Sequence, residues 1–412
     1  MELYWSWSVV DFNIDDFISK YVTKRAESLF APDIQTNKER LQASIEGNTM
    51  LVIGGAGSIG SSFIKACLPF KPRSLVVVDV NENGLAELTR DLRSTKDLFI
   101  PDDYVSYPIN YADSVFEKLF RARKGFDIVA NFSAHKHVRT EKDIYSIEAL
   151  LKNNVINAKR LLDLLKAFPP EAFFCVSTDK AANPVNVMGA SKRIMEDLIF
   201  SYSDYFPVKT ARFANVAFSN GSLPAGFLER IAKYQPISAP TDVKRYFVSP
   251  KESGEICMLA CMLGYNREVY FPKLDQVSMM TFSDIAEKLL KVLGYNVDKC
   301  SSEEEAKEKA SQLFNGSRDY PVYFSTSDTT GEKAYEEFFT QAETVDMTRF
   351  SSLGVVVNHS TCSKNQVEAL FERLEYVFKK SEVTKAEIVM ILKDFLPSFE
   401  HKEVGRNLDG KM

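Results

Sequence analysis

The side chains best suited to moving protons gather in one short segment of this chain. Asp179 and Lys180 stand side by side, Thr178 precedes them, and a second lysine, Lys192, follows soon after. A carboxyl group can protonate a leaving hydroxyl, and a neutral amine can take a proton from carbon, provided that burial or nearby charge shifts their pKa values suitably. The segment therefore indicates general acid–base chemistry. The alternative is that Asp179 and Lys180 pair with each other on the surface.

An apolar run places this segment at the end of a strand. Residues 172–176 read as a buried strand, so the acid–base segment lies at its carboxyl end, where open α/β sheets bind their ligands. Asn183-Pro184 then looks like a helix start, since proline suits the first helical turn. In a helix from there onward, Met188 and Lys192 are four positions apart and share one face.

The chain before about residue 215 alternates strands with helices. Further strands are expected at 50–53, 74–78 and 127–131, with helical patterns such as 147–165 between them. This alternation predicts right-handed βαβ units, and hence an α/β fold with a Rossmann-type doubly wound parallel sheet.

A glycine-rich loop between the first strand and its helix is the second chemical feature. Gly54, Gly57 and Gly60 fit the GxxGxxG dinucleotide fingerprint, whose glycines allow a tight turn, close approach of a pyrophosphate and helix-on-strand packing. Ser58 and Ile59 stand between them, where a helix amino terminus offers N–H groups to phosphates. The spacing predicts a dinucleotide-binding loop rather than a structural glycine turn.

Asp79, at the end of the next strand, bears on which dinucleotide binds. A carboxylate here can accept hydrogen bonds from the adenosine ribose and would repel a 2′-phosphate, which favours NAD over NADP. The nearby basic residues that could hold a 2′-phosphate, and so leave NADP open, are Lys71, Arg73, Arg90 and Arg93.

Four regions follow from these patterns. We expect a helical N-terminal appendage at 1–48, an NAD-binding Rossmann domain at 49–215, a smaller α/β substrate-binding lobe at 216–360 and a helical C-terminal tail at 361–412. The appendage is too short for a domain, so it is expected to dock elsewhere on the chain or on a second subunit of a homo-oligomer.

The composition is that of a soluble globular protein. Of the 412 residues, 45% are hydrophobic and 26% charged, and a net charge of −5 argues against a nucleic-acid partner. No apolar run approaches the roughly 18 residues of a membrane span, and the first residues lack the pattern of a signal peptide. The cysteines are scattered, and the alternating His135 and His137 have no third ligand nearby, so no metal is expected. These features predict a reduced, cytoplasmic protein.

Several motifs together resemble one family, and they span about residues 50–340. The motifs are Gly54 to Gly60, Asp79, Ser133-Ala134-His135-Lys136-His137-Val138, Asn153-Asn154-Val155, Ser177 to Lys192, Arg212-Phe213-Ala214-Asn215-Val216, Arg245-Tyr246-Phe247 and Gly331-Glu332-Lys333. In these the chain resembles the CapD-like nucleotide-sugar 4,6-dehydratases of bacterial polysaccharide biosynthesis, within the extended short-chain dehydrogenases. The run from Ser177 to Lys192 is the most specific part of the match.

The resemblance implies a reaction that oxidises C4 of a sugar, removes the C5 proton, expels the C6 hydroxyl and returns the hydride to C6. It implies that Asp179 is the acid at the leaving hydroxyl and Lys180 the base at C5. Lys192 would hold the nicotinamide ribose and keep Lys180 neutral by like charge. Members of the long-chain branch act on UDP-N-acetylglucosamine and share methionine at the position of Met188, where other short-chain dehydrogenases have a tyrosine. Thr178, or a water that it positions, is then the candidate acceptor of the C4 hydroxyl proton.

The resemblance also assigns binding residues. Those implied for NAD are Gly54, Gly57, Ser58, Ile59, Gly60, Asp79, Ser133, Ala134, Asn154 and Lys192. Those implied for the nucleotide sugar are Lys136, Met188, Asn215 and Arg245. Arg245 suits the diphosphate because a guanidinium fork matches phosphate oxygens. For Asn154, a structural amide is the alternative.

The chain also departs from the family pattern. Residues 108–110 lack the aspartate usual there, Ala214 replaces a glycine, and Thr329 stands near the place of an arginine expected to face the diphosphate. The last departure leaves the sugar nucleotide open. The alternative functions are a nucleotide-sugar 4-epimerase, which needs no acid–base pair at C5 and C6, and a catalytically silent NAD-binding sensor or scaffold.

Overall fold

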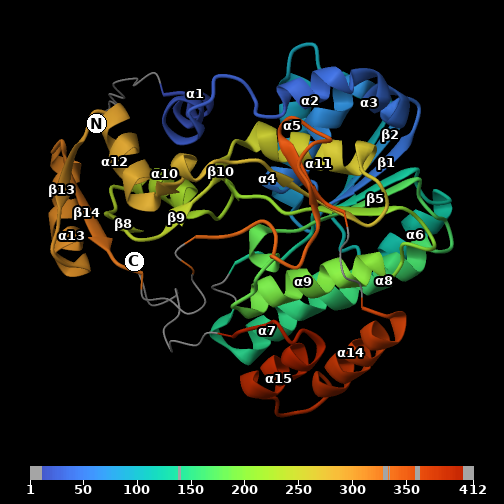
Figure 1. The fold of residues 1–412 in the computed structure, drawn as a ribbon. Helices are drawn as coiled ribbons and strands as arrows, with labels where there is room; N and C mark the ends of the chain where they lie inside the picture. The colour runs from blue at the N-terminus through green and yellow to red at the C-terminus, as the bar shows by residue number, and fades with distance from the viewer. Residues whose placement is uncertain (1–11, 138–140, 328–332, 334, 358–361, 402–412) are drawn as a thin grey trace.

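The computed structural model describes residues 12–137, 141–327, 333, 335–357 and 362–401, and a nine-stranded sheet forms its centre (Figure 1). The strands lie in the order β15-β16-β11-β6-β5-β4-β1-β2-β3. Their bounds are β1 Thr49–Ile53, β2 Ser74–Val78, β3 Asp103–Tyr107, β4 Ile128–Asn131, β5 Ala172–Val176, β6 Val208–Ala211, β11 Glu268–Pro272, β15 Val345–Asp346 and β16 Leu353–Val356.

The sheet is parallel from β11 to β3, and only its last two strands are antiparallel, β16 to β11 and β15 to β16. The strand order changes direction between β1 and β4, which is the switch point where doubly wound sheets bind ligands. The predicted Rossmann-type fold is confirmed. Strands β11, β15 and β16 come from the range expected for the smaller lobe, so the main sheet draws on both sides of residue 215.

Helices cover both faces of this sheet (Figure 1). Their bounds are α4 Ser58–Cys67, α5 Glu82–Ser94, α6 Ser114–Ala122, α7 Ile144–Leu151, α8 Asn157–Leu165, α9 Val187–Phe200 and α11 Pro250–Leu263. Helices α4 and α11 pack together on one face, and α7, α8 and α9 lie on the other. The α4–α11 contact requires Gly254, since a Cβ there would collide with the backbone of Ser62.

Two predicted helices differ in detail from those observed. The helix expected to start at Asn183-Pro184 starts at Val187, because Asn186 caps it by accepting a hydrogen bond from the N–H of Gly189. The helix expected over 147–165 is interrupted by a π-helical turn, η4 (Lys152–Ile156), between α7 and α8. Such a turn re-aims side chains and is frequent at functional sites.

A smaller lobe with its own hydrophobic core stands beside the sheet. It contains a parallel three-stranded sheet in the order β13-β14-β8, and two short ladders that pair β7 with β10 and β9 with β12. Its elements are β7 Asn215–Val216, α10 Leu223–Ala232, β8 Ile237–Pro240, β9 Lys244–Arg245, β10 Phe247–Val248, η6 Gln276–Ser278, β12 Met280–Thr281, α12 Phe282–Val292, β13 Asn296–Lys299, α13 Glu303–Ala310, η7 Ser311–Asn315 and β14 Asp319–Ser325.

The N-terminal segment packs against its own chain. Its elements are α1 Ile14–Phe17, the π-helical η1 Ile18–Thr23, α2 Ala31–Thr36 and α3 Lys38–Ile45. Phe17 belongs to the core of the smaller lobe, while Leu41 belongs to the main core. Between them, Arg25 forms an ion pair of 2.7 Å with Glu252 at the start of α11. The segment thus connects the two cores.

The C-terminal helices α14 (Lys364–Val377) and α15 (Lys385–Phe395) lie outside α7, α8 and α9 (Figure 1). Lys159 of α8 pairs with Glu368 of α14 at 3.4 Å and also lies over the ring of Phe371. Lys385 reaches Glu141 at 3.2 Å. These contacts dock the tail on the helices that flank the acid–base segment.

Candidate active site

The acid–base segment leaves β5 and forms a single 3₁₀ turn, η5 (Asp179–Ala181). Asp179 is buried, and its Oδ1 accepts from the hydroxyl of Thr178 at 2.8 Å and from Nζ of Lys180 at 3.0 Å. The Lys180 side chain is 19% exposed. The acid and the base are therefore paired inside the protein rather than on its surface.

The charge on Lys180 differs from the expectation. Burial lowers the pKa of Lys180, but the carboxylates of Asp179 and Glu336 raise it more, so the net shift is upward. The cation that opposes these carboxylates is Arg245. That Lys192 keeps Lys180 neutral by like charge stays a prediction, and in this structure the carboxylates of Asp179 and Glu336 outweigh the cation Arg245.

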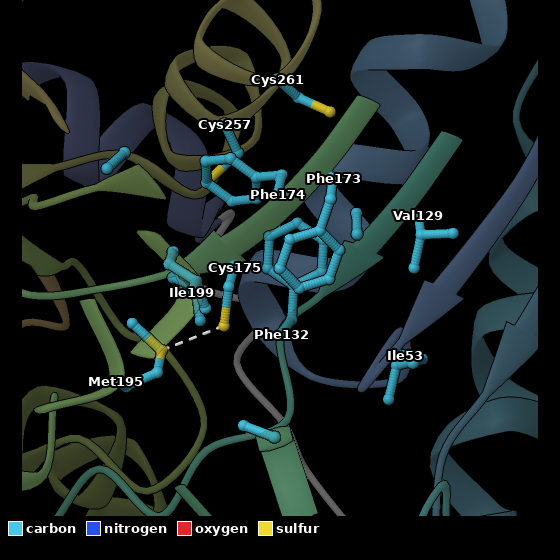
Figure 2. Packing of buried hydrophobic residues seen from close by; sticks show 14 of the residues in the cluster. Ile53, Val129, Phe132, Phe173, Phe174, Cys175, Met195, Ile199, Cys257 and Cys261 are labelled. Carbon is cyan, nitrogen blue, oxygen red and sulfur yellow. Dashed lines mark hydrogen bonds between the residues drawn. The ribbon is translucent and has the colours of Figure 1, made fainter. Parts of the chain in front are cut away.

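Lys192 is itself buried on α9, in surroundings that contain sulfur. Its Nζ lies 3.4 Å from Sδ of Met195, and the thiol of Cys175 on β5 lies 3.0 Å from the same sulfur (Figure 2). Burial lowers the pKa of Lys192, against the opposing effects of Cys175 and Glu196. Met188, one turn earlier, is fully enclosed in the main core. A thioether cannot transfer protons, so its observed part here is packing.

The glycine loop has the shape that a pyrophosphate requires. Gly54 has a φ of +74°, and a Cβ on it would lie 2.6 Å from the backbone nitrogen of Ser133. Gly57 caps α4, and a Cβ on Gly60 would overlap the carbonyl of Gly54. The first turn of α4, with Ser58 and Ile59, presents backbone N–H groups that have no partner within the helix. These features fit a dinucleotide whose phosphates lie at the start of α4.

Asp79 lies directly beside this loop. Its Oδ2 accepts from the N–H of Ala56 at 3.0 Å and its Oδ1 from the N–H of Asn81 at 2.9 Å. A carboxylate has about four acceptor positions, so these bonds leave capacity for a ribose diol. Asp79 thus holds the loop in shape and presents negative charge beside it.

The segment after β4 and the π-helical turn meet at Asn154. Its side-chain oxygen accepts from the N–H of His135 at 2.8 Å, and its amide donates to the carbonyl of His135 and to the hydroxyl of Ser191 at 3.0 Å. The π-helical turn therefore aims Asn154 between the loop that carries Ser133 and Ala134 and the residue before Lys192. In this structure the Asn154 amide makes structural hydrogen bonds, as in the alternative interpretation, and it lies within the region expected to bind the cofactor.

The residues implied for substrate lie around the lobe side of the segment. Nζ of Lys136 donates to the carbonyl of Asn220 at 3.0 Å. Asn215 starts β7, and its N–H donates to the carbonyl of Tyr246. Arg245 is buried on β9 and donates to the carbonyl of Lys333 at 2.9 Å. Of these residues, the structure brings Arg245 close to Lys180 through a shared carboxylate, that of Glu336.

Glu336 is the residue that the sequence analysis missed. It is buried, and its Oε1 lies 3.9 Å from Nζ of Lys180 and 3.8 Å from Nη2 of Arg245. Its signal was the acidic pair Glu336-Glu337, which follows the matched motif that ends at Lys333. Val138, Thr329, Gly331 and Glu332 lie outside the described residues.

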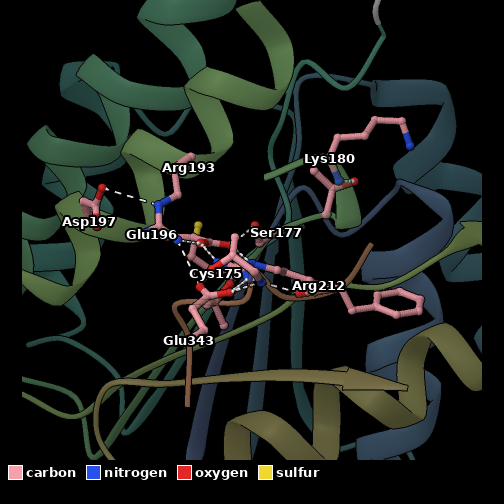
Figure 3. Close-up of polar contacts among 12 residues, drawn as sticks. Cys175, Ser177, Lys180, Arg193, Glu196, Asp197, Arg212 and Glu343 are labelled. Atoms are coloured by element: carbon pink, nitrogen blue, oxygen red, sulfur yellow. Dashed lines mark hydrogen bonds and ion pairs between the residues drawn. The ribbon is translucent and has the colours of Figure 1, made fainter. Parts of the chain in front are cut away.

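A second charge network lies beside the acid–base segment (Figure 3). Arg212 is fully buried and donates to Glu196 at 2.6 and 2.9 Å and to Glu343 at 2.8 and 2.9 Å. Burial alone would lower the pKa of Arg212, but the two glutamates raise it above its ordinary value. Ser177, adjacent to Thr178, donates to Glu196 at 2.5 Å. The network joins β5, α9 and the segment around Glu343.

Two classes of site are not seen in the described ranges. Across residues 12–137, 141–327, 333, 335–357 and 362–401, no group of His, Cys, Asp and Glu side chains is arranged to hold a metal ion. Within the same ranges, no helix is long and apolar enough to cross a lipid bilayer.

The chain is similar to known proteins of one family. Residues 50–358 match the model of a family described as "Polysaccharide biosynthesis protein". The chain is 30% identical to the "Uncharacterized membrane protein MJ1061" of Methanocaldococcus jannaschii, over 82% of this chain and 94% of that protein. It is 26% identical to the capsular polysaccharide biosynthesis protein CapD of Staphylococcus aureus, over 76% of this chain and 51% of CapD. It is 25% identical to an inverting UDP-N-acetylglucosamine 4,6-dehydratase of Campylobacter jejuni, over 61% of this chain and 73% of that enzyme.

The chain spans about half the length of CapD and of a second curated relative, EpsC of Bacillus subtilis. Among solved structures, Pen from Bacillus thuringiensis aligns with a TM-score of 0.61 at 20% identity, over 80% of this chain and 98% of Pen. The dTDP-glucose 4,6-dehydratase DesIV from Streptomyces venezuelae, solved with NAD bound, aligns with a TM-score of 0.50 at 18% identity, over 68% of this chain and 88% of DesIV. At these identities the structures establish a shared fold.

Proposed function

Because the chain belongs to the polysaccharide biosynthesis protein family, among the CapD-like extended short-chain dehydrogenases, we propose that it is a nucleotide-sugar 4,6-dehydratase. Its substrate would be UDP-N-acetylglucosamine and its product a UDP-4-keto-6-deoxy sugar. The observation that carries this proposal is the buried pairing of Asp179 with Lys180 at the carboxyl end of β5. An epimerase acting only at C4 would have no use for that acid and base.

NAD is the cofactor in this proposal. The start of α4 and the glycine loop would hold its phosphates, Asp79 its adenosine ribose, and Lys192 its nicotinamide ribose. When bound, NAD would accept a hydride from C4 of the sugar and return it to C6. The charge of Asp79 beside the loop supports NAD over NADP. A cytoplasmic location and a homo-oligomeric state are part of the same proposal.

The hydrogen bond from Thr178 to Asp179 offers a route for the first proton. In the proposed reaction, Thr178 Oγ1 accepts the proton of the C4 hydroxyl while its own proton passes to Oδ1 of Asp179, along the bond of 2.8 Å. Asp179 is then a neutral acid, loaded with a proton that came from the substrate. This relay does without the phenol that other short-chain dehydrogenases have at the position of Met188.

Protonation of Asp179 changes the pKa of the neighbouring Lys180. The carboxylate of Asp179 is an anion that raises the pKa of Lys180, so its protonation lowers that pKa and favours release of the ammonium proton to bulk water, which leaves the free amine. Lys180 can then take the C5 proton, the C5–H electrons form the C5–C6 double bond, and the C6–O bond breaks. Asp179 gives its proton to the departing oxygen, which leaves as water. Lys180 would then return a proton to C5 when the hydride is delivered to C6. C4 oxidation would thus precede water elimination, because Lys180 becomes a free amine only after Asp179 has received the proton of the C4 hydroxyl.

Incubation of the purified protein with UDP-N-acetylglucosamine tests this function. We expect loss of one water from the sugar nucleotide by mass spectrometry, and none with Asp179→Asn or Lys180→Ala. A C4 epimer of unchanged mass would assign the site to an epimerase instead. No conversion of UDP- or dTDP-linked hexoses by the cofactor-loaded protein would favour the silent NAD-binding sensor.

A further inference from the structure

Glu336 lies at ion-pair distance from Lys180 and belongs to neither the dinucleotide loop nor the acid–base motif. It lies 156 positions after Lys180 in the sequence, and yet its carboxylate reaches ion-pair distance of that amine. The same oxygen, Oε1, lies 3.8 Å from Arg245. A single carboxylate therefore faces both the expected base and the residue expected to bind diphosphate.

The chain around Glu336 is held on both sides, so this position is built into the fold. Before it, Lys333 donates from Nζ to the carbonyl of Asn183, and its own carbonyl accepts from Arg245. After it, Glu337 accepts from the side-chain amide of Asn183 at 2.8 Å. The carbonyl of Phe338 then accepts from Arg212 at 3.0 Å. These contacts anchor residues 335–338 against the loop that follows Lys180.

Four charged groups face Glu336 from the elements packed around it. Burial raises the pKa of Glu336, Asp179 raises it further, and Lys180, Arg245 and Lys333 lower it, with a net upward shift. The carboxyl group thus retains a proton at a higher pH than an ordinary glutamate does.

Resting on the dehydratase function proposed above, we infer that Glu336 is a positioning residue that sets the charge of Lys180. Ionised Glu336 stabilises the ammonium form of Lys180. When Glu336 is neutral, this stabilisation comes from the carboxylate of Asp179 instead. Once Asp179 has also been neutralised by the C4 proton, the cation Arg245 favours the free amine. Glu336 acts through Lys180 and needs no contact with the substrate.

The direct test is the titration of Lys180 in the cofactor-loaded protein without substrate. Protein labelled with ¹³C at the lysine ε-carbons reports each lysine by NMR, and Lys180→Arg identifies the signal. We expect Glu336→Gln to lower the titration midpoint of Lys180 by about 1–3 pH units, the range for loss of a close opposite charge. The neighbouring Glu337→Gln changes the same chemistry on a side chain that contacts Asn183 instead, and should leave the midpoint unchanged.

Turnover gives the second readout. With UDP-N-acetylglucosamine, kcat should rise with pH as Lys180 deprotonates, and Glu336→Gln should move that rise to lower pH by the same amount, with Glu337→Gln as wild type. A structural role would lower kcat at every pH without moving the profile. If Glu336→Gln fails to fold, Glu336→Asp retracts the carboxylate by one methylene and should move the midpoint in the same direction by less.

The two proposals separate cleanly in these experiments. An unchanged Lys180 midpoint in Glu336→Gln, with normal dehydration of the substrate, overturns the role of Glu336 and leaves the dehydratase standing. A shifted midpoint in a protein that dehydrates no nucleotide sugar supports the charge coupling and overturns the dehydratase.

Discussion

Ser177 donates a hydrogen bond of 2.5 Å to the carboxylate of Glu196, which ties the end of β5 to the middle of α9. Glu196 stands one helical turn after Lys192, and Ser177 directly precedes Thr178. The strand end that carries the acid–base pair and the helix that carries the second lysine are therefore held at a fixed separation. Arg212 completes the link by pairing with the same carboxylate.

Arg212→Met should destabilise the protein far more than its single charge suggests. It removes the fully buried partner of Glu196 and Glu343, which also lie near the less buried Arg193, and loss of one partner of a buried pair costs about 3–5 kcal/mol. Urea denaturation followed by circular dichroism measures the change. The matched control is Arg121→Met, whose pair with Glu117 is exposed and should contribute about 0–1 kcal/mol. Equal losses in the two variants would refute the role of burial.

Thr178→Val should slow oxidation at C4, because it removes the hydroxyl that passes the first proton to Asp179. With hydride transfer made slower, the kinetic isotope effect of a C4-deuterated substrate should increase. Thr210→Val on β6, whose hydroxyl donates to the carbonyl of Cys175, serves as the control and should leave the isotope effect unchanged. An unaltered isotope effect in Thr178→Val would mean that another group takes the C4 proton.

Met188→Leu should keep most of the activity, since Met188 is enclosed in the core and a swap that nearly conserves volume costs less than ~1.5 kcal/mol. Lys192→Ala should lose far more, because it removes the expected ribose contact and leaves a cavity beside Met195. Both are compared by kcat and by the amount of dinucleotide bound after purification. A folded, cofactor-loaded Met188→Leu as inactive as Lys192→Ala would show that the thioether has a specific role.

Asp79→Asn should weaken the preference for NAD over NADP, because it removes the charge that would repel a 2′-phosphate. The amide retains one acceptor oxygen for the N–H of Ala56, whereas Asp79→Ala also loses that support of the loop. Mass spectrometry of the dinucleotide released from purified protein, followed by affinity measurements for each form, checks the change. Wild-type protein that carries only NADP would contradict the assignment.

Much of the fold could be predicted because its signals are local. The apolar runs 50–53 and 172–176 and the glycine spacing of the loop each depend on neighbours in the sequence, and they specify the strands and the dinucleotide turn. The start of α9 was misplaced because Asn183-Pro184 and Asn186 both carry helix-start signals, and the side chain of Asn186 makes the capping bond.

The site could be predicted only where its residues are adjacent. Asp179 and Lys180 are adjacent in the sequence and can be recognised as a pair. The charge of Lys180 also depends on Glu336, which is distant in the sequence and is brought close by the fold. The π-helical turn that aims Asn154 likewise has no periodic signal, because it is one short turn of five residues between two regular helices.

The N-terminal segment joins two hydrophobic cores that the paired strands β7 and β10 also connect. Phe17 contributes to one core and Leu41 to the other, and the ion pair of Arg25 with Glu252 lies on the stretch between them. Unfolding of either core should therefore destabilise the other, because this short stretch of chain contributes to both. We expect the lobe and the main domain to melt in a single cooperative transition, and any opening between them to be limited by the length of this tether.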